Sequence, residues 1–161
     1  MCREYTSKES HMAINIEQLK MLREETGAGI MDVRRALEES NGDLAKARAW
    51  IKEKAVKIAE KKSDRETGEG FVGSYVHTTG KVAGMVALAC ETDFVARTED
   101  FKNLSRELAM QVASMSPENV EEFLKQPYIR DAKKSISDLV KETAGKVGEN
   151  IVVKQIVRVT V

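Results

Sequence analysis

The chain has few of the residues that catalytic and metal sites most often use. Its 161 residues include only two cysteines, Cys2 and Cys90, and two histidines, His11 and His77. Two cysteines cannot build a disulfide framework or a four-ligand zinc site, and their scarcity favours a reducing compartment. The first twelve residues contain no apolar stretch of the kind that a signal peptide requires. We therefore expect a cytoplasmic protein.

Charge of one sign and long apolar runs are absent as well. Lys and Arg together number 26, as do Asp and Glu, so the formal net charge is zero. This balance argues against a globally basic nucleic-acid binder and against an acidic tail. No apolar run approaches the roughly 18 residues of a membrane span. We expect neither a membrane nor direct contact with nucleic acid, and aliphatic residues must fill the core because aromatic residues make up only 5%.

The first eleven residues, MCREYTSKESH, are polar and lack periodicity. The junction from Ser10 to Met12 resembles a cloning remnant, so we interpret residues 1–11 as a leader or tag, with a natural disordered N-terminus as the alternative. Cys2 and His11 belong to this leader, and we expect no metal site built from them.

Residues 12–52 carry the pattern of three short-linked helices. Asn15 can cap the first helix, residues 27–29 (GAG) end it, Asn41-Gly42 ends the second, and Asp43 can cap the third. We predict a three-helix domain at 12–52 and a helical linker at 53–67. Residues 44–65 hold eight basic and three acidic residues. We interpret this local excess as a solvated connector, with an RNA-binding stripe as the alternative.

Beyond Gly68 the period of the apolar residues changes from that of a helix to that of a strand. Residues 71–77 alternate, residues 78–81 can turn the chain, and residues 82–90 (VAGMVALAC) form a nearly continuous apolar run, so we predict a hairpin. Helices follow from Thr98, from Ser116-Pro117 and around 136–147. The Val-rich segment 151–161 is expected to pair with the hairpin and to place its apolar residues on one side. We predict an α+β core at 68–161, a three-stranded antiparallel sheet covered by helices on one face.

Two catalytic or nucleotide-binding patterns are present only in part. Gly68-x-Gly70-x-x-Gly73 matches the dinucleotide fingerprint in letters, but these glycines follow a helix and open a strand, the reverse of the real motif. Cys90 lies inside an apolar strand, where a thiol is usually inert, and His77 lies in a different strand. The residues alone therefore favour a protein that is not an enzyme.

The segment from Glu91 to Arg97, ETDFVAR, connects a buried strand to a helix and carries two apolar side chains. Phe94 and Val95 can plug the corner between sheet and helix. Alternatively, Asp93 and Phe94 form an acidic and apolar pair that is offered to a partner. The residues alone favour neither interpretation.

Three ordered segments resemble the elongation factor Ts family. Residues 92–97, TDFVAR, resemble its TDFVA signature. Residues 22–33, LREETGAGIMDV, are similar to its N-terminal signature, and residues 146–151, KVGENI, are similar to a segment near its end. The motifs follow the family's order and span nearly all of the chain beyond the leader.

The resemblance implies both a fold and a function. The N-terminal helices would be the family's ubiquitin-associated-like domain, and the remainder its core domain. Members of the family are guanine-nucleotide exchange factors that bind elongation factor Tu with GDP, promote GDP release and allow GTP to bind. Such a protein makes and breaks no bond and has no cofactor of its own, because it acts on the partner's GDP and Mg²⁺. A non-exchanging interaction module or RNA-associated adaptor of the same fold is the alternative.

The resemblance also assigns roles to residues of the 92–97 segment. Phe94 would wedge between apolar side chains of the partner's G domain, and Asp93 would disturb the switch region beside the magnesium ion. Thr92 and Val95 belong to the same signature and are counted with them as partner-binding residues.

Two further contacts follow from the resemblance. Arg23, Ile30 and Met31 match the family's contact with a helix of the G domain, and Ile30 and Met31 cannot both face a three-helix core. His77 matches a hairpin histidine that approaches the phosphate-loop side of the GTPase. Longer members duplicate the core and divide the Asp-Phe pair and this histidine between the copies. A single copy therefore implies a homodimer in which Phe94 and His77 come from different subunits.

One region departs from the family pattern. Only eleven residues separate Met115 from Pro127, where family members generally carry a longer helical insertion. Any partner contact or dimer surface that the insertion makes is absent from this chain.

Overall fold

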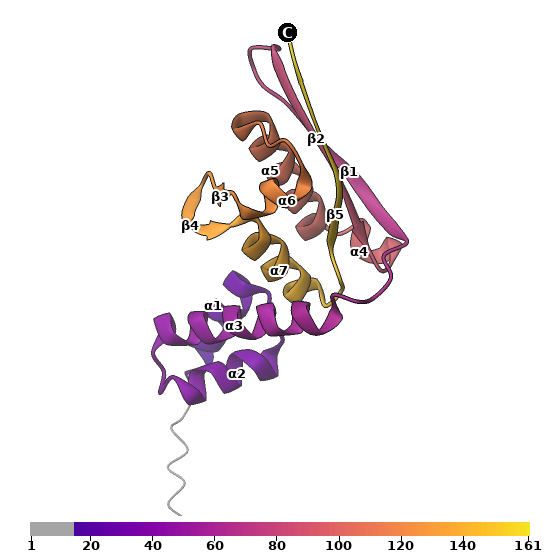
Figure 1. The fold of residues 1–161 in the computed structure, drawn as a ribbon. Coiled ribbons are helices and arrows are strands. Elements are labelled where there is room, and N and C mark those ends of the chain that lie inside the picture. Colours follow the sequence, from indigo (N-terminus) through magenta and orange to yellow (C-terminus); the bar gives the residue numbers. More distant parts are fainter. Residues whose placement is uncertain (1–14) are drawn as a thin grey trace, which may run out of the picture. The chain divides into compact units, whose positions relative to one another are not determined.

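The computed structural model describes residues 15–161, so the leader with Cys2 and His11 lies outside the described residues. The chain divides into two compact units between Ile51 and Lys52. The predicted α+β class is confirmed: helices come first, and a three-stranded antiparallel sheet with further helices follows (Figure 1). The domain limits proposed from the sequence stay predictions. None of the helices among residues 15–161 is both long and apolar enough to cross a membrane.

The first unit contains α1 (Ile16–Thr26), α2 (Ile30–Glu39) and the start of α3 (Leu44–Lys62). Asn15 caps α1 by accepting a hydrogen bond from the Glu17 N–H at 2.9 Å, and Gly27 ends this helix with φ of +67°. Asp43 caps α3, because its Oδ1 accepts hydrogen bonds from the backbone N–H groups of residues 45 and 46. These short connections bring six apolar side chains into one core: Leu22, Val33, Ala36, Leu37, Ala47 and Ile51.

The second unit is built on the strands β1 (Glu69–Val76), β2 (Val82–Cys90) and β5 (Val152–Thr160), in the order β1-β2-β5. Helix α5 (Glu99–Met115) lies close against one face of this sheet. Gly73 and Gly84 allow the approach, because a Cβ on either would lie within 2.6 Å and 2.2 Å of a carbonyl oxygen of α5. One face of the sheet is therefore covered by α5, as the sequence predicts.

The last strand does not keep its apolar residues on one side, so that expectation is wrong. Leu88 pairs with Val153, but the neighbouring Ala87 pairs with Gln155, which leaves one extra residue in β5. This bulge reverses the alternation along the strand. Val153 faces the helix-covered core, whereas Val157 and Val159 lie on the opposite face and are exposed.

The remaining elements are short except for the last helix. They are α4 (Asp93–Ala96), α6 (Val120–Lys125), β3 (Pro127–Tyr128), β4 (Asp131–Ser135) and α7 (Ile136–Val147). The helix expected to start at Ser116-Pro117 instead begins at Val120, because Asn119 caps it through the Glu122 N–H at 2.8 Å. The β3–β4 hairpin has no apolar alternation in its sequence and was not predicted. The helix predicted around 136–147 is α7, which ends at Val147 and has Gly148 as its C-cap with φ of +77°.

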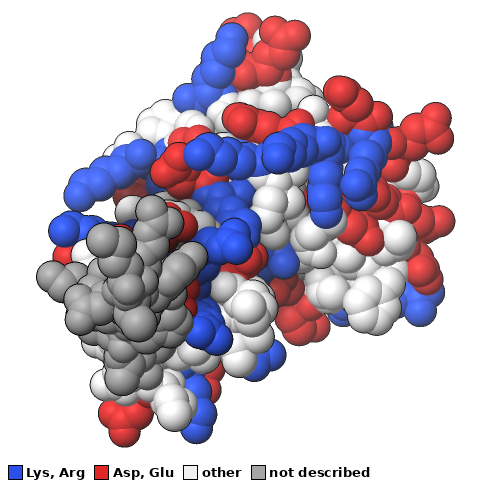
Figure 2. All heavy atoms as spheres, turned by 90° about the horizontal axis from the view of Figure 1, so that it is seen from below, with Lys and Arg blue, Asp and Glu red and all other residues white. Residues whose placement is uncertain are grey.

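Two lysines in the second unit's part of α3 form ion pairs with acidic side chains. Lys52 pairs with Glu142 at 2.8 Å, and Lys57 pairs with Glu53 at 2.6 Å. Figure 2 shows basic and acidic side chains next to one another on the face it presents. This arrangement favours the interpretation of the basic excess as a solvated connector rather than as an RNA-binding stripe.

Candidate functional site

The segment that carries the TDFVA resemblance forms a single helical turn, α4, directly after β2. Thr92 has extended backbone angles, and its hydroxyl accepts a hydrogen bond from the Val95 N–H at 3.4 Å, so it caps the turn. Asp93 occupies the first turn, where a carboxylate suits the exposed backbone N–H groups. Its Oδ2 lies 2.8 Å from Arg97, and both side chains are largely exposed. Such a surface ion pair holds Asp93 only weakly.

The two apolar residues of α4 have opposite environments. Phe94 is 78% exposed, while Val95 is 5% exposed and packs in the core beneath the sheet and α5. Phe94 and its neighbours Asp93, Arg97 and Thr98 line a shallow, open hollow. The two interpretations left open by the sequence therefore apply to one residue each: Val95 plugs the corner, and Phe94 projects outward. Val95 offers almost no surface to a partner, so the expectation that it binds one finds no support here.

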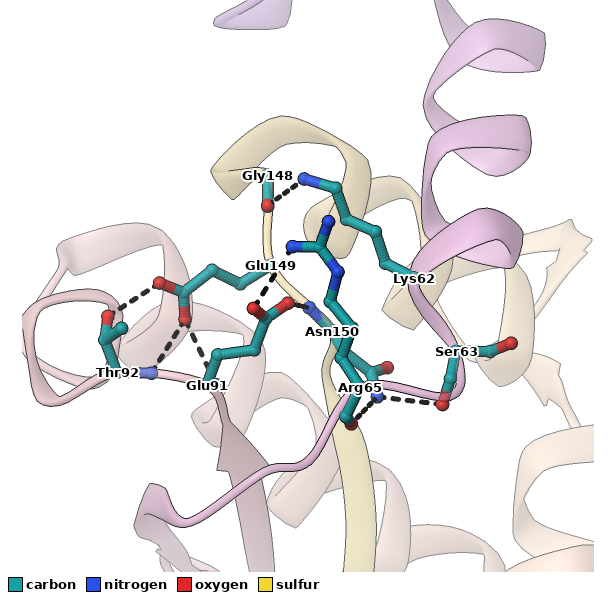
Figure 3. Close-up of polar contacts among 8 residues, drawn as sticks. All are labelled: Lys62, Ser63, Arg65, Glu91, Thr92, Gly148, Glu149 and Asn150. Carbon is teal, nitrogen blue, oxygen red and sulfur yellow. Dashed lines mark hydrogen bonds and ion pairs between the residues drawn. The ribbon is translucent and has the colours of Figure 1, made fainter.

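A carboxylate from the end of the chain holds the start of this turn. Oε2 of Glu149 accepts hydrogen bonds from the N–H groups of Glu91 and Thr92 at 3.1 and 3.0 Å, and its Oε1 accepts one from the Thr92 hydroxyl at 2.6 Å (Figure 3). In the sequence, Glu149 belongs to the 146–151 segment that resembles the family, and nothing there predicts its contact with this turn. A glutamate directly after a helix C-terminus is disfavoured by the helix dipole, and this was the available signal that it has another partner.

A second set of hydrogen bonds joins the same region to the end of α3. The Glu91 carboxylate accepts the Asn150 N–H at 2.8 Å and lies 3.3 Å from Arg65. The Asn150 amide donates to the carbonyl oxygens of Ser63 and Arg65 at 3.0 and 2.9 Å (Figure 3). The Asn150 N–H, followed by Arg65, holds the pKa of Glu91 below its ordinary value, so this carboxyl stays ionised. We call Arg65, Glu91, Thr92, Glu149 and Asn150 the polar clamp.

Cys90 lies under the same turn and behaves as a structural residue. Its side chain is fully buried, and its Sγ donates a hydrogen bond to the carbonyl oxygen of Thr92 at 3.2 Å. Burial raises the pKa of the thiol, which keeps it protonated and a poor nucleophile. Within residues 15–161, no group of three or more His, Cys, Asp or Glu side chains is arranged to hold a metal ion.

His77 lies at the opposite end of the hairpin from α4. It follows β1, is exposed, and its Nδ1 lies 2.9 Å from the Thr79 hydroxyl. The adjacent strand β2 has nine residues, and at about 3.3 Å per residue it is about 30 Å long. Figure 1 shows the β1–β2 turn and α4 at the two ends of this strand. One chain therefore does not bring His77 and Phe94 together.

The residues proposed from the first unit lie on its surface. Ile30 is 51% exposed and Met31 is 68% exposed, and Arg23 is exposed on α1. Both apolar side chains point away from the core, although only one was required to do so by the sequence argument. Adjacent exposed apolar residues at a helix start are typical of a contact surface.

Comparison with known proteins identifies the family. Residues 91–161 match the family model described as Elongation factor TS. The chain is 41% identical to Elongation factor Ts of Rubrobacter xylanophilus, with 91% of this chain and 98% of the relative aligned. It is 40% identical to Elongation factor Ts of Coprothermobacter proteolyticus, with 92% and 98% aligned. This chain belongs to the elongation factor Ts family. The resemblance found in the sequence motifs is thereby confirmed.

This elongation factor Ts family member is shorter than its relatives. The alignment with the R. xylanophilus protein covers 192 positions, which exceeds the 161 residues of the whole chain by 31. At least 31 of the aligned positions in the R. xylanophilus protein therefore have no matching residue in this chain. The eleven residues between Met115 and Pro127 are where we predict the missing stretch.

The chain after this short segment is tied back onto α5. Gln111, which is fully buried, donates to the carbonyl oxygen of Pro127 and accepts the Ile129 N–H, both at 3.0 Å. The Tyr128 hydroxyl donates to Glu107 at 2.7 Å. Burial, reinforced by this acidic partner, raises the pKa of Tyr128 to about 12. These contacts hold residues 127–129 against α5.

Proposed function

We propose that this chain is a guanine-nucleotide exchange factor that binds elongation factor Tu with GDP and promotes GDP release. The observation that carries the proposal is the exposed Phe94 beside Asp93, held on a capped turn by a polar clamp. Family membership supplies the partner. The protein makes and breaks no covalent bond, and it needs no cofactor of its own because GDP and Mg²⁺ belong to the GTPase.

The proposed mechanism is a coupling of two binding free energies. Phe94 inserts between apolar side chains of the G domain and displaces their packing. Asp93 brings a negative charge to the switch region, which weakens Mg²⁺ and with it GDP. Because the coupling is reciprocal, the factor and the nucleotide each lower the other's affinity for the GTPase. The weak ion pair with Arg97 leaves Asp93 available for this role.

A second contact is proposed for the N-terminal unit. Ile30 and Met31 supply exposed apolar surface, and Arg23 supplies a guanidinium group. These three residues would hold the GTPase while Thr92, Asp93 and Phe94 act on it. Val95 is left out of the proposed contact because its side chain is buried.

We further propose that two copies act together. The family resemblance implies that one GTPase meets His77 and Phe94 from different subunits, and the length of β2 keeps these two residues apart within one chain. The sheet face opposite α5 offers the surface for pairing, because most of its exposed side chains are apolar, beside the polar Ser74 and Gln155. They are Val72, Val76, Met85, Val157 and Val159. The molecular mass in solution tests this: we expect a dimer that Met85→Glu converts to monomers, and a monomeric native chain would contradict it.

One assay separates exchange from the alternative of a non-exchanging adaptor. Elongation factor Tu is loaded with fluorescent GDP, and release into excess unlabelled GDP is followed with and without the chain. We expect release to accelerate with increasing chain and to saturate. Stable binding without faster release at micromolar chain would favour the adaptor.

A further inference from the structure

In the polar clamp, the carboxylate of Glu149 contacts the residues directly before α4, the turn that presents Phe94. A single oxygen of Glu149 receives two consecutive backbone N–H groups, those of Glu91 and Thr92. Two donors on one acceptor fix the orientation of the peptide between them. Because the acceptor is a carboxylate, these hydrogen bonds restrain the turn more strongly than bonds to a neutral oxygen would.

The Thr92 hydroxyl transmits this restraint into α4. It donates to Oε1 of Glu149 at 2.6 Å and accepts from the Val95 N–H at 3.4 Å. When the hydroxyl proton points to the carboxylate, a lone pair is free for the Val95 N–H, so the two hydrogen bonds reinforce each other. Without Glu149 the hydroxyl can rotate, and the cap that sets the direction of α4 weakens.

Glu149 is itself held in place by its neighbours. The next residue, Asn150, is buried and donates from its side chain to the carbonyl oxygens of Ser63 and Arg65. Its backbone N–H binds Glu91 at 2.8 Å. Lys62 donates to the carbonyl oxygen of Gly148, directly before Glu149. Three chain segments, 62–65, 91–92 and 148–150, therefore meet at one point, as Figure 3 shows.

We propose that Glu149 is a positioning residue for nucleotide exchange, which acts through Thr92 to hold Phe94 in its outward orientation. This inference rests on the proposed exchange function. A wrongly oriented Phe94 still lets the chain bind through its other contacts, but it inserts into the GTPase less often. Loss of Glu149 should therefore lower the maximal rate of GDP release far more than the affinity for the GTPase.

The test compares Glu149→Ala, Glu149→Gln and Thr92→Val with the native chain in the GDP-release assay. We expect Glu149→Ala to lower the saturating rate about tenfold, the size expected for lost hydrogen bonds to a charged group. The half-saturating concentration should change less than about threefold. Glu149→Gln keeps one side-chain oxygen for the two N–H groups, so its saturating rate should lie between those of the native chain and Glu149→Ala. Thr92→Val, which leaves Glu149 in place, should also reduce the rate.

A matched control and a double variant separate positioning from general stability. Asp100→Ala removes another carboxylate that contacts the α7 end, through Lys146 at 2.7 Å, but it does not touch the turn. It should retain the native rate. In a Phe94→Ala background, Glu149→Ala should cause less than about a twofold further loss, because both act through one side chain. A native rate for Glu149→Ala, or a full further loss in that background, would overturn the inference.

A second readout distinguishes failure of this inference from failure of the proposed function. If the native chain does not accelerate GDP release, the proposed function fails, and the clamp is then judged by amide hydrogen exchange. Glu149→Ala should expose the Glu91 and Thr92 amides and speed their exchange roughly tenfold or more, with the core strands unchanged. Unchanged protection at these two amides would refute the clamp whether or not the chain is an exchange factor.

Discussion

Replacing Phe94 by alanine should strongly reduce exchange activity while leaving the fold intact. A phenylalanine side chain contributes about 150–250 Å² of surface, and Phe94 is 78% exposed. Roughly 150 Å² thus remains for a partner to cover, which at about 25 cal/mol per Å² corresponds to at most about 3 to 4 kcal/mol. The saturating rate of GDP release should fall by up to a few hundredfold.

The same exposure predicts almost no effect of this substitution on stability. The Phe94 side chain takes no part in the Thr92 cap or in the Asp93–Arg97 ion pair, and removing an exposed side chain of this kind changes the free energy of unfolding by about 0.5 kcal/mol or less. Phe101 provides the matched control, because it is the same residue type but is fully buried in the core of the second unit. Phe101→Ala should cost about 3 to 5 kcal/mol of stability.

Chemical denaturation and the GDP-release assay together decide this prediction. The expected pattern is a native unfolding midpoint with a strongly reduced exchange rate for Phe94→Ala, and a lowered unfolding midpoint for Phe101→Ala. If Phe94→Ala is strongly destabilised, Phe94 plugs the corner and does not serve as a wedge. If it is stable and fully active, the proposed role of Phe94 is refuted.

Three other predictions concern the sheet, a tyrosine and the dimer. Gly84→Ala should lower the free energy of unfolding by more than about 2 kcal/mol, because the added Cβ would lie 2.2 Å from the α5 backbone. Gly68→Ala is the control: a Cβ at this position has no atom within 4 Å, so the same unfolding experiment should show little change. The pKa of Tyr128 is raised to about 12, so this residue adds folding stability that is fully present below about pH 10 and is lost as the pH rises towards 12. Ultraviolet titration should show that the Tyr128 phenol ionises at a higher pH than an ordinary tyrosine. Tyr128→Phe should reduce the loss of folding stability between about pH 10 and 12. Mixing Asp93→Ala chains with His77→Ala chains should restore about a quarter of the native exchange sites, since half of randomly mixed dimers are hybrids with one intact site; no recovery would argue against sharing.

The helices were largely predictable because local residues define their ends. Asn15, Asp43 and Thr98 cap helices as expected, each through a side-chain oxygen that accepts backbone N–H groups. The sequence placed the start of α6 at Ser116-Pro117, but both Pro117 and Asn119 can begin a helix. In the structure the side chain of Asn119 makes the capping hydrogen bond, so α6 starts at Val120. Local pattern alone does not decide between two such signals.

The features that were not predictable depend on contacts between distant segments. The bulge in β5 shifts one residue relative to β2, and no residue in the Val-rich sequence marks it. The division between a buried Val95 and an exposed Phe94 depends on which side of α4 meets the core. The polar clamp joins Glu91 to Glu149, which lie 58 residues apart, so sequence order alone could not bring them together.

The most direct test of the central claim is the reciprocal effect of GDP on binding of this chain. The affinity of the chain for elongation factor Tu is measured twice, without nucleotide and with saturating GDP and Mg²⁺, by titration calorimetry. An exchange factor must bind more weakly when GDP is present, by the same factor by which it weakens GDP. We predict that GDP lowers the affinity by at least about tenfold. Equal affinities in the two states would contradict the account, because a protein with no preference between them cannot promote nucleotide release.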